Sequence, residues 1–267
     1  MDYVFPPQSQ YRLAQITDCH LMPTADEFYQ QIQPAKYLQA IVEQLCQEQP
    51  DGVILSGDLV QNASAASYQL LADIFAPLTC PVFCLPGNHD DLQQLEMLSH
   101  IAPFQAATSL RLASWQLLLL NTKGPTPSGV FGLEQQHWLQ QQLQLSTKQF
   151  IQHSAENSAA KAVWLFCHHH PRPLGCSIDI HGQLDADILW QHILADSRIQ
   201  GIAHGHSHYA YSARFAKVNI VGCPASSVQF LATPEWQTID QGPQWCDWIF
   251  NADQTVQWQF RSLDRNN

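Results

Sequence analysis

Basic residues are scarce in this chain. Its 267 residues include 12 lysines and arginines against 23 aspartates and glutamates, which gives a formal net charge of −11. Proteins that bind nucleic-acid backbones or anionic membranes display clustered positive charge that neutralises phosphate groups. The composition therefore argues against nucleic acid or a membrane as a partner. An anionic substrate would also be repelled, unless bound metal cations reversed the field inside its site.

A secretion signal, long apolar runs and closely paired cysteines are missing as well. The N-terminal residues show no basic region followed by an apolar stretch, and no run approaches the roughly 20 residues needed to span a bilayer. The eight cysteines include no CxxC pair, so neither a disulfide framework nor a zinc ribbon is indicated. The sequence predicts a cytoplasmic protein with reduced thiols.

What the chain does contain is an alternation of short apolar runs with helical patterns. Apolar residues recur at helical spacing in residues 34–49, 64–75, 133–145 and 185–195. Strands are predicted at residues 13–17, 52–56, 81–85, 110–113, 115–120, 163–167, 199–203, 209–215, 218–221, 245–250 and 256–261. These βα units, followed by strands expected to be mostly antiparallel, favour an α/β (α+β) protein with two mixed sheets face to face and helices outside. Without a repeat or a long linker, residues 1–267 are predicted to form a single domain.

Five polar motifs follow directly on the ends of predicted strands. They are Asp18-Cys19-His20, Gly57-Asp58, Gly87-Asn88-His89-Asp90, His168 at the start of a run of three histidines, and Gly205-His206-Ser207-His208. Loops from neighbouring strands converge, so these side chains can share one site. Two carboxylates, one amide and four or five imidazoles together favour a binuclear metal site. Two divalent cations would outweigh the two carboxylates and a bridging hydroxide, and so present a cationic pocket to a phosphate.

Each motif taken alone also has a plain structural explanation. Asp18 and His20 could lie in a surface loop, Asp58 in an ordinary turn, and Asn88 in a left-handed turn after Pro-Gly. In an extended segment, residues two apart point to the same side, which would direct Asp18 and His20 toward one metal. The same alternation would place His206 and His208 together.

Several other histidines have no role fixed by the pattern. His169 and His170 could contact substrate, support a ligand or simply form a turn, and His181 lies in a loop that could reach a substrate. His204 is expected to be a strand or supporting residue.

The motifs, in this order and at these spacings, resemble the calcineurin-like metallophosphoesterase superfamily over residues 12–230. The amino-acid sequences of residues 15–21, 85–90, 168–177 and 224–230 are similar to those of the bacterial class III 3',5'-cyclic-AMP phosphodiesterases. The resemblance implies a four-layer αββα sandwich that binds two metal ions, iron or manganese, with zinc, cobalt, nickel or magnesium as further options. Cys19 stands where the family more often has Thr or Ser, and it is expected to face away from the metals.

The resemblance also implies a role for each matching residue. One metal is held by Asp18, His20 and His208, the second by Asn88, His168 and His206, and Asp58 bridges them. His89 matches the catalytic histidine, placed to stabilise the attacked phosphate and to protonate the departing 3' oxygen. Contacts to the substrate are implied for His20, Asp58, Asn88, His89, His168 and His208.

Three functions follow from these observations. The first is hydrolysis of the small phosphodiester cyclic AMP to 5'-AMP, by attack of a metal-bridging hydroxide. The second keeps this mechanism but acts on another phosphodiester or a phosphomonoester, because a fold alone does not select a substrate. The third is a metal-binding regulatory protein without catalysis, which the presence of every expected ligand and of His89 disfavours. A lipid-precursor pyrophosphatase is disfavoured because such relatives have arginine where His89 stands.

Overall fold

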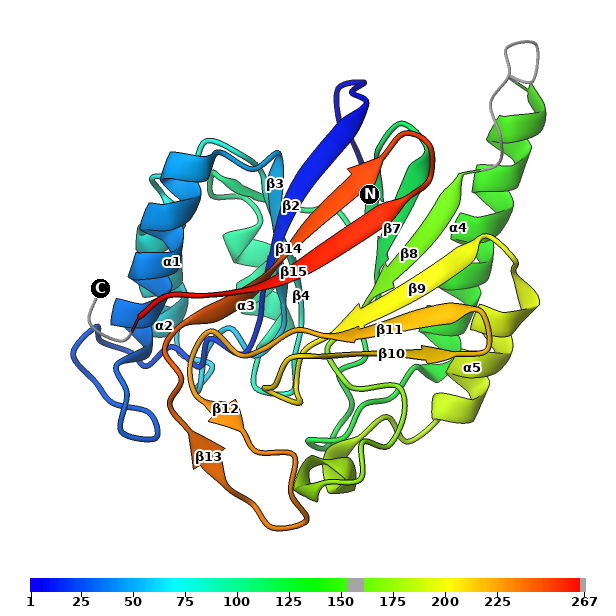
Figure 1. The fold of residues 1–267 in the computed structure, drawn as a ribbon. Coiled ribbons are helices and arrows are strands. Elements are labelled where there is room, and N and C mark those ends of the chain that lie inside the picture. The colour runs from blue at the N-terminus through cyan, green and yellow to red at the C-terminus, as the bar shows by residue number, and fades with distance from the viewer. Residues whose placement is uncertain (153–160, 265–267) are drawn as a thin grey trace.

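The computed structural model describes residues 1–152 and 161–264, and its centre consists of two large mixed β-sheets packed face to face (Figure 1). The six-stranded sheet runs in the order β15 (Val256–Ser262), β14 (Gln244–Asn251), β2 (Gln10–Ile16), β3 (Gly52–Ser56), β4 (Val82–Leu85) and β5 (Phe104–Gln105). The seven-stranded sheet runs in the order β1 (Asp2–Val4), β6 (Ser109–Arg111), β7 (Trp115–Leu119), β8 (Ala162–Phe166), β9 (Ile199–His204), β11 (Val218–Gly222) and β10 (Tyr211–Phe215). Buried side chains of both sheets, such as Ile54, Phe83 and Trp164, fill the space between them.

Helices cover the outer face of each sheet (Figure 1). Beside the six-stranded sheet lie α1 (Pro34–Glu48), α2 (Ala65–Phe75) and α3 (Leu92–Leu98), and beside the seven-stranded sheet lie α4 (Gly132–Gln152) and α5 (Ala186–Ala195). This arrangement is the four-layer αββα sandwich that the resemblance implied. A short 3-10 helix, η1 (Ser177–His181), and a separate two-stranded hairpin, β12 (Gln229–Phe230) with β13 (Thr238–Ile239), lie beyond the sheets.

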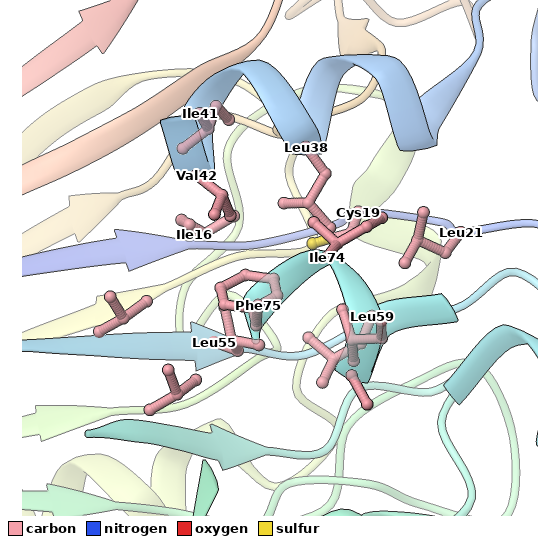
Figure 2. Close-up of a cluster of buried hydrophobic side chains, with 14 of the residues drawn as sticks. Ile16, Cys19, Leu21, Leu38, Ile41, Val42, Leu55, Leu59, Ile74 and Phe75 are labelled. Carbon is pink, nitrogen blue, oxygen red and sulfur yellow. The ribbon is translucent and has the colours of Figure 1, made fainter. Parts of the chain in front are cut away.

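The apolar stripe of α1 explains why this helix lies on its sheet. Leu38, Ile41 and Val42 recur at helical spacing and point toward Ile16 of β2, while Phe75 of α2 packs into the same cluster (Figure 2). Burying such side chains contributes about 1.5–3 kcal/mol each. A proline in the first turn of α1, where its missing N–H costs nothing, fixes the start of the helix.

The predicted elements are confirmed, with one error of strand direction. The four predicted helices and all eleven predicted strands are present within a few residues of the expected bounds, although α4 continues to Gln152. The expectation of mostly antiparallel strands in the second half was wrong in part. Strands β7, β8 and β9 pair in parallel because α4 and α5 act as crossover connections between them. Strand β11 pairs in parallel with β9 after the chain has passed through β10. The short elements β1, β5, α3, η1, β12 and β13 were not predicted.

The parallel pairing determines where the polar motifs meet. In one sheet β2, β3 and β4 run parallel, and in the other β8 and β9 do so. The carboxyl ends of parallel strands meet at one edge of a sheet, and in open α/β sheets ligands bind at that edge.

None of the helices in the described residues is long and apolar enough to cross a membrane.

Candidate metal centre

The five motifs converge on one buried group of ligand atoms. The nearest ligand atoms of Asp18, His20 and His208 all lie within 4.8 Å of one another, and so do those of Asp18, Asp58 and His168. These side chains are almost completely shielded from solvent. Residues from both sheets therefore contribute to a single site.

One end of the site is formed by Asp18, His20 and His208. The Nε2 atoms of the two histidines are 3.1 Å apart, and Nε2 of His208 is 3.2 Å from Oδ1 of Asp18. This carboxylate oxygen is buried and has no hydrogen-bond partner in the part of the chain that the structure describes. A buried carboxylate oxygen without a donor, facing two imidazole nitrogens, is the arrangement expected of a cation site.

The other end is formed by Asn88, His168 and His206. Nε2 of His168 lies 3.3 Å from Oδ1 of Asn88 and 3.3 Å from Nδ1 of His206. Between the two ends lies Asp58, whose Oδ2 is 3.2 Å from Nε2 of His168 and 3.9 Å from Nε2 of His20. Asp58 thus faces ligands of both groups, and Oδ1 of Asp18 also lies 4.0 Å from Nε2 of His168.

The second ring nitrogen of each of these histidines is held by the protein. The partners are Gln61 Oε1 for His20 at 2.8 Å, Ser56 O for His168 at 2.9 Å, His181 O for His206 at 3.0 Å and Val228 O for His208 at 2.7 Å. An oxygen acceptor fixes the proton on that nitrogen, so the opposite nitrogen presents its lone pair to the site. Metal-binding histidines in proteins are commonly oriented in this way.

The backbone at the site corrects one step of the sequence argument. Five of the predicted ligands have positive φ: Asp18 at 52°, His20 at 48°, Asp58 at 52°, His206 at 60° and His208 at 57°. All five are therefore left-handed, and the expectation that Asp18, His20, His206 and His208 lie in extended segments was wrong. Residues other than glycine rarely adopt this conformation, and where they do the strain often marks a functional site. Asn88 is not among the described residues with positive φ. The left-handed turn that was the plain structural explanation for Asn88 is therefore not found there.

Two glycines allow the strand ends to approach this closely. Gly57 has a φ of 95°, and a Cβ atom there would lie 2.4 Å from Nδ1 of His168. At Gly87 a Cβ atom would lie 2.2 Å from Oδ1 of Asp58. Any side chain at either position would push a predicted ligand out of place.

Burial and charge act in opposite directions on the ligands. Burial lowers the pKa of His20 to about 3, so its ring is neutral and able to bind a cation. Burial also disfavours a charged His168, but the carboxylates of Asp58 and Asp18 outweigh it and raise the pKa of His168 to about 9. Burial would raise the pKa of Asp58, yet His168 holds it well below its ordinary value. Positive charge is thus favoured between the carboxylates, and metal binding would release that proton.

His89 lies at the rim of the site, in the first turn after β4. Its Nδ1 is 2.9 Å from the carbonyl oxygen of Gln61, and its backbone N–H donates to Oδ1 of Asp58 at 2.8 Å. The carbonyl fixes the proton on Nδ1 and leaves Nε2 available. The structure thus brings His89 together with all seven predicted metal ligands, while their roles in binding and catalysis stay predictions.

The histidines without an assigned role prove to be supporting residues or wall residues. Both ring nitrogens of His169 are engaged, by Thr122 Oγ1 at 2.9 Å and by Pro127 O at 3.1 Å. His204 is bonded to Gly205 O and to the hydroxyl of Tyr211, as expected for a strand residue behind the site.

The remaining two belong to the loop that carries η1. Nε2 of His170 lies 3.2 Å from Asp179, which also accepts hydrogen bonds from the backbone of Leu174 and Gly175. His181 lines the cleft and offers its carbonyl oxygen to His206. Cys19 is buried in the apolar cluster beneath α1, which agrees with the expectation that it would face away from a metal (Figure 2).

Sequence reasoning missed several residues that shape the site. Gln61 orients both His20 and His89, and buried Asp90 accepts hydrogen bonds from the backbone of Leu59 and Gly87, which joins two ligand loops. Asp90 was visible within its motif, but Gln61 carried no signal beyond its place three residues after Asp58.

Comparison with known proteins places this geometry in a family. Residues 11–210 match the family model described as calcineurin-like phosphoesterase. The chain belongs to this family. It is therefore an enzyme that hydrolyses phosphoric esters with the help of divalent metal ions.

Two relatives and one solved structure illustrate the likeness. A probable cyclic nucleotide phosphodiesterase of Pseudoalteromonas is 33% identical over 95% of this chain and 93% of its own length. The 3',5'-cyclic adenosine monophosphate phosphodiesterase CpdA of Vibrio vulnificus is 29% identical over 96% of this chain and 91% of its own. A dimetal phosphatase from Danio rerio has the same fold, with a TM-score of 0.57, 13% identity and coverage of 94% of this chain and 98% of its own.

The residues of this phosphoesterase fit a pair of metal ions. Carboxylate and amide oxygens together with imidazole nitrogens suit divalent ions from magnesium and manganese to iron and zinc. Oδ1 of Asp18 lacks a hydrogen-bond donor among the described residues. Four histidines are oriented so that a nitrogen lone pair of each points into the site, as at His20 and His208. These donor atoms are therefore directed toward the place that the metal ions would occupy.

Gln61 offers a test of this orientation. Gln61→Leu is expected to weaken manganese binding about 10- to 100-fold, because His20 loses the acceptor that directs its ring. The affinity would be measured by competition with a chelator. Gln61→Glu, which keeps an acceptor oxygen, should bind manganese at least as tightly as the original protein. Equal affinities in the leucine variant and the original protein would show that Gln61 does not orient the ligand.

Proposed function

We propose that this phosphoesterase hydrolyses 3',5'-cyclic nucleotides, cyclic AMP in particular, to 5'-nucleotides at a binuclear metal centre. The observation that carries the proposal is the convergence of seven ligand side chains at one site, where five of them line a small cleft together with His89. The names of the Pseudoalteromonas and Vibrio relatives support the choice of a cyclic nucleotide. The cleft has a volume of about 220 Å³, below the roughly 300–1,000 Å³ of typical ligand pockets, and this size favours a small substrate.

The proposed ligand sets follow the two ends of the site. Asp18, His20 and His208 would hold one ion, Asn88, His168 and His206 would hold the other, and Asp58 would be shared. Iron and manganese are the proposed metals. When bound, such a pair supplies hydroxide at neutral pH and neutralises the attacking and leaving oxygens of an in-line displacement.

The protein's own side chains complete the reaction. His20, Asp58, Asn88, His168 and His208 surround the place where the phosphate would lie, and His89 stands beside them. Because Nδ1 of His89 is held by the Gln61 carbonyl, its Nε2 is the atom that can donate a proton to the departing 3' oxygen. In-line attack at phosphorus breaks the bond to the 3' oxygen, and the product is the 5'-monophosphate.

Residues 1–267 are proposed to form one domain, because both sheets supply ligands of the proposed centre. β2, β3 and β4 carry Asp18, Asp58 and Asn88 at their ends, whereas β8 and β9 of the other sheet carry His168 and His206. The proposed centre requires both sheets, so neither half would form it alone.

The test is product analysis of cyclic AMP incubated with manganese-loaded protein. We expect 5'-AMP and no 3'-AMP, and we expect the product to disappear after a chelator removes the metal and to return when manganese is restored. Bis(p-nitrophenyl) phosphate serves as a generic diester in parallel. Hydrolysis of the generic diester without any cleavage of cyclic AMP would contradict the proposed substrate and leave the metal chemistry standing.

A further inference from the structure

The candidate cleft extends beyond the metal centre and has an apolar side. Besides five of the predicted ligands and His89, it is lined by Tyr29, Pro127, Ile178, His181, Phe230 and Trp236. These six residues belong to loops, to η1 and to the β12–β13 hairpin, and of them the sequence pointed only to His181 as able to reach a substrate. A phosphate at the metal centre would have the rest of its ester beside this wall.

Contacts between three successive rings connect the metal centre with the outer end of the wall. The imidazole of His208 and the ring of Phe230 are parallel within 5°, with centroids 3.8 Å apart. The ring of Trp236 lies 4.5 Å from Phe230 on a tilted plane. Phe230 is buried, whereas Trp236 is 50% exposed. An indole that is packed on one side and half open to a cleft offers a preformed apolar surface to a ligand.

The loop that carries Trp236 is held in place by hydrogen bonds. The backbone N–H of Leu231 donates to the carbonyl of Gln237, which closes the tip of the hairpin. The backbone N–H of Ser177 donates to the carbonyl of Thr233 at 3.0 Å, which ties η1 to the hairpin. At the base, the buried amide of Gln229 donates to carbonyl oxygens on both sides of the loop. The walls on either side of the outer cleft are therefore joined to each other.

We propose that Trp236 is the platform on which the planar base of the nucleotide stacks while its phosphate occupies the metal centre. The inference rests on the proposed function, since it assigns the part of the substrate that the metal ligands do not hold. Every nucleobase has a flat face, and stacking on an aromatic ring is tolerant of its identity. Trp236 would thus be a substrate-binding residue, without a part in moving protons or binding metal.

The lining of the cleft also implies weak discrimination between bases. Among the described residues that line it, the only carboxylate and amide side chains are Asp58 and Asn88, both at the metal centre. The Tyr29 hydroxyl and the His181 ring also line the cleft, but each can donate or accept a hydrogen bond and so serves either base. Strong selection between adenine and guanine requires side chains that hydrogen-bond the base edge. Cyclic AMP and cyclic GMP are therefore expected to bind within about tenfold of each other, because stacking carries the recognition.

The test compares two ligands that differ only in the base. The affinities of 5'-AMP and ribose 5-phosphate for manganese-loaded protein would be measured by calorimetry, so that turnover is not needed. In the original protein 5'-AMP should bind roughly 5- to 150-fold more tightly, the range expected for one stacked base. Trp236→Ala should bring the two affinities together, while Trp236→Phe should keep most of the difference. Leu133→Ala, which removes an exposed side chain at the start of α4, is the matched control and should change neither affinity.

Two outcomes would overturn the inference. One is equal affinity of the two ligands in the original protein, and the other is an unchanged ratio in Trp236→Ala with normal metal content. These outcomes are separate from the fate of the proposed function. Cyclic AMP hydrolysis together with equal affinities would reject only the platform. A base preference that Trp236→Ala removes, in a protein that does not cleave cyclic AMP, would uphold the platform and reject the proposed reaction.

Discussion

Replacing Asp58 with alanine is expected to remove both metal ions and all measurable hydrolysis. Asp58 is the carboxylate whose oxygen faces histidines of both proposed ligand sets. Losing a residue that merely orients a ligand costs about 10- to 100-fold in metal affinity, so losing a shared, charged ligand should cost more for each ion. Metal content after dialysis, measured by elemental analysis, should fall from two equivalents to near zero.

Two controls separate this effect from misfolding. Asp58→Asn keeps the shape and an oxygen that can accept the hydrogen bond from the His89 backbone, so it should fold and bind metal more weakly than the original protein. Asp73→Ala removes an exposed aspartate of α2 and should retain both ions. A folded Asp58→Ala protein with two tightly bound ions would refute the shared role.

His89→Ala is expected to keep the metals and lose about 10²- to 10⁴-fold in turnover of cyclic AMP, the usual contribution of a positioned proton donor. The loss should be much smaller with bis(p-nitrophenyl) phosphate, because p-nitrophenolate leaves as a stable anion and needs no proton. Steady-state kinetics on both substrates, with the metal content of each preparation, would measure the difference.

Comparing the two substrates distinguishes two possible roles of His89. An equal loss on both would indicate that His89 acts by stabilising the attacked phosphate rather than by donating a proton. Unchanged rates on cyclic AMP would remove His89 from the mechanism. His100→Ala, an exposed histidine just after α3, is the matched control and should behave like the original protein.

The sequence carried enough information to assemble the centre of the site. Each predicted ligand directly follows an apolar strand, and strand ends are positions that topology brings together, so Asp18, Asp58 and His168 could be grouped without coordinates. The layers of the fold followed from the same alternation. Burial of both faces makes strands read as continuous apolar runs, as in Gly52–Ser56, and such runs are easy to recognise.

What sequence could not supply were the features that depend on tertiary contact. The left-handed backbone of His20 and His208 is imposed by the surrounding loops, and no local preference of histidine predicts it. Gln61 contacts His20 through its side-chain amide oxygen and His89 through its backbone carbonyl oxygen. Every residue type has a backbone carbonyl, so the second contact leaves no mark in the sequence. Trp236 lies in a polar loop 28 residues beyond His208, and tertiary contacts such as the packing of Phe230 onto that histidine bring it to the cleft.

The contribution of both sheets to one centre has a consequence for biosynthesis. His20 and His208, whose Nε2 atoms face each other, are 188 residues apart in the chain. A ribosome adds about 5–20 residues each second and folding begins from the N-terminus, so Asp18, Asp58 and His89 leave the exit tunnel well before their partners exist. On the proposed ligand sets, the growing chain lacks His208 of one set and both histidines of the other, so neither set of ligands is complete. Activity toward a signalling nucleotide would then begin only when the polypeptide is nearly finished.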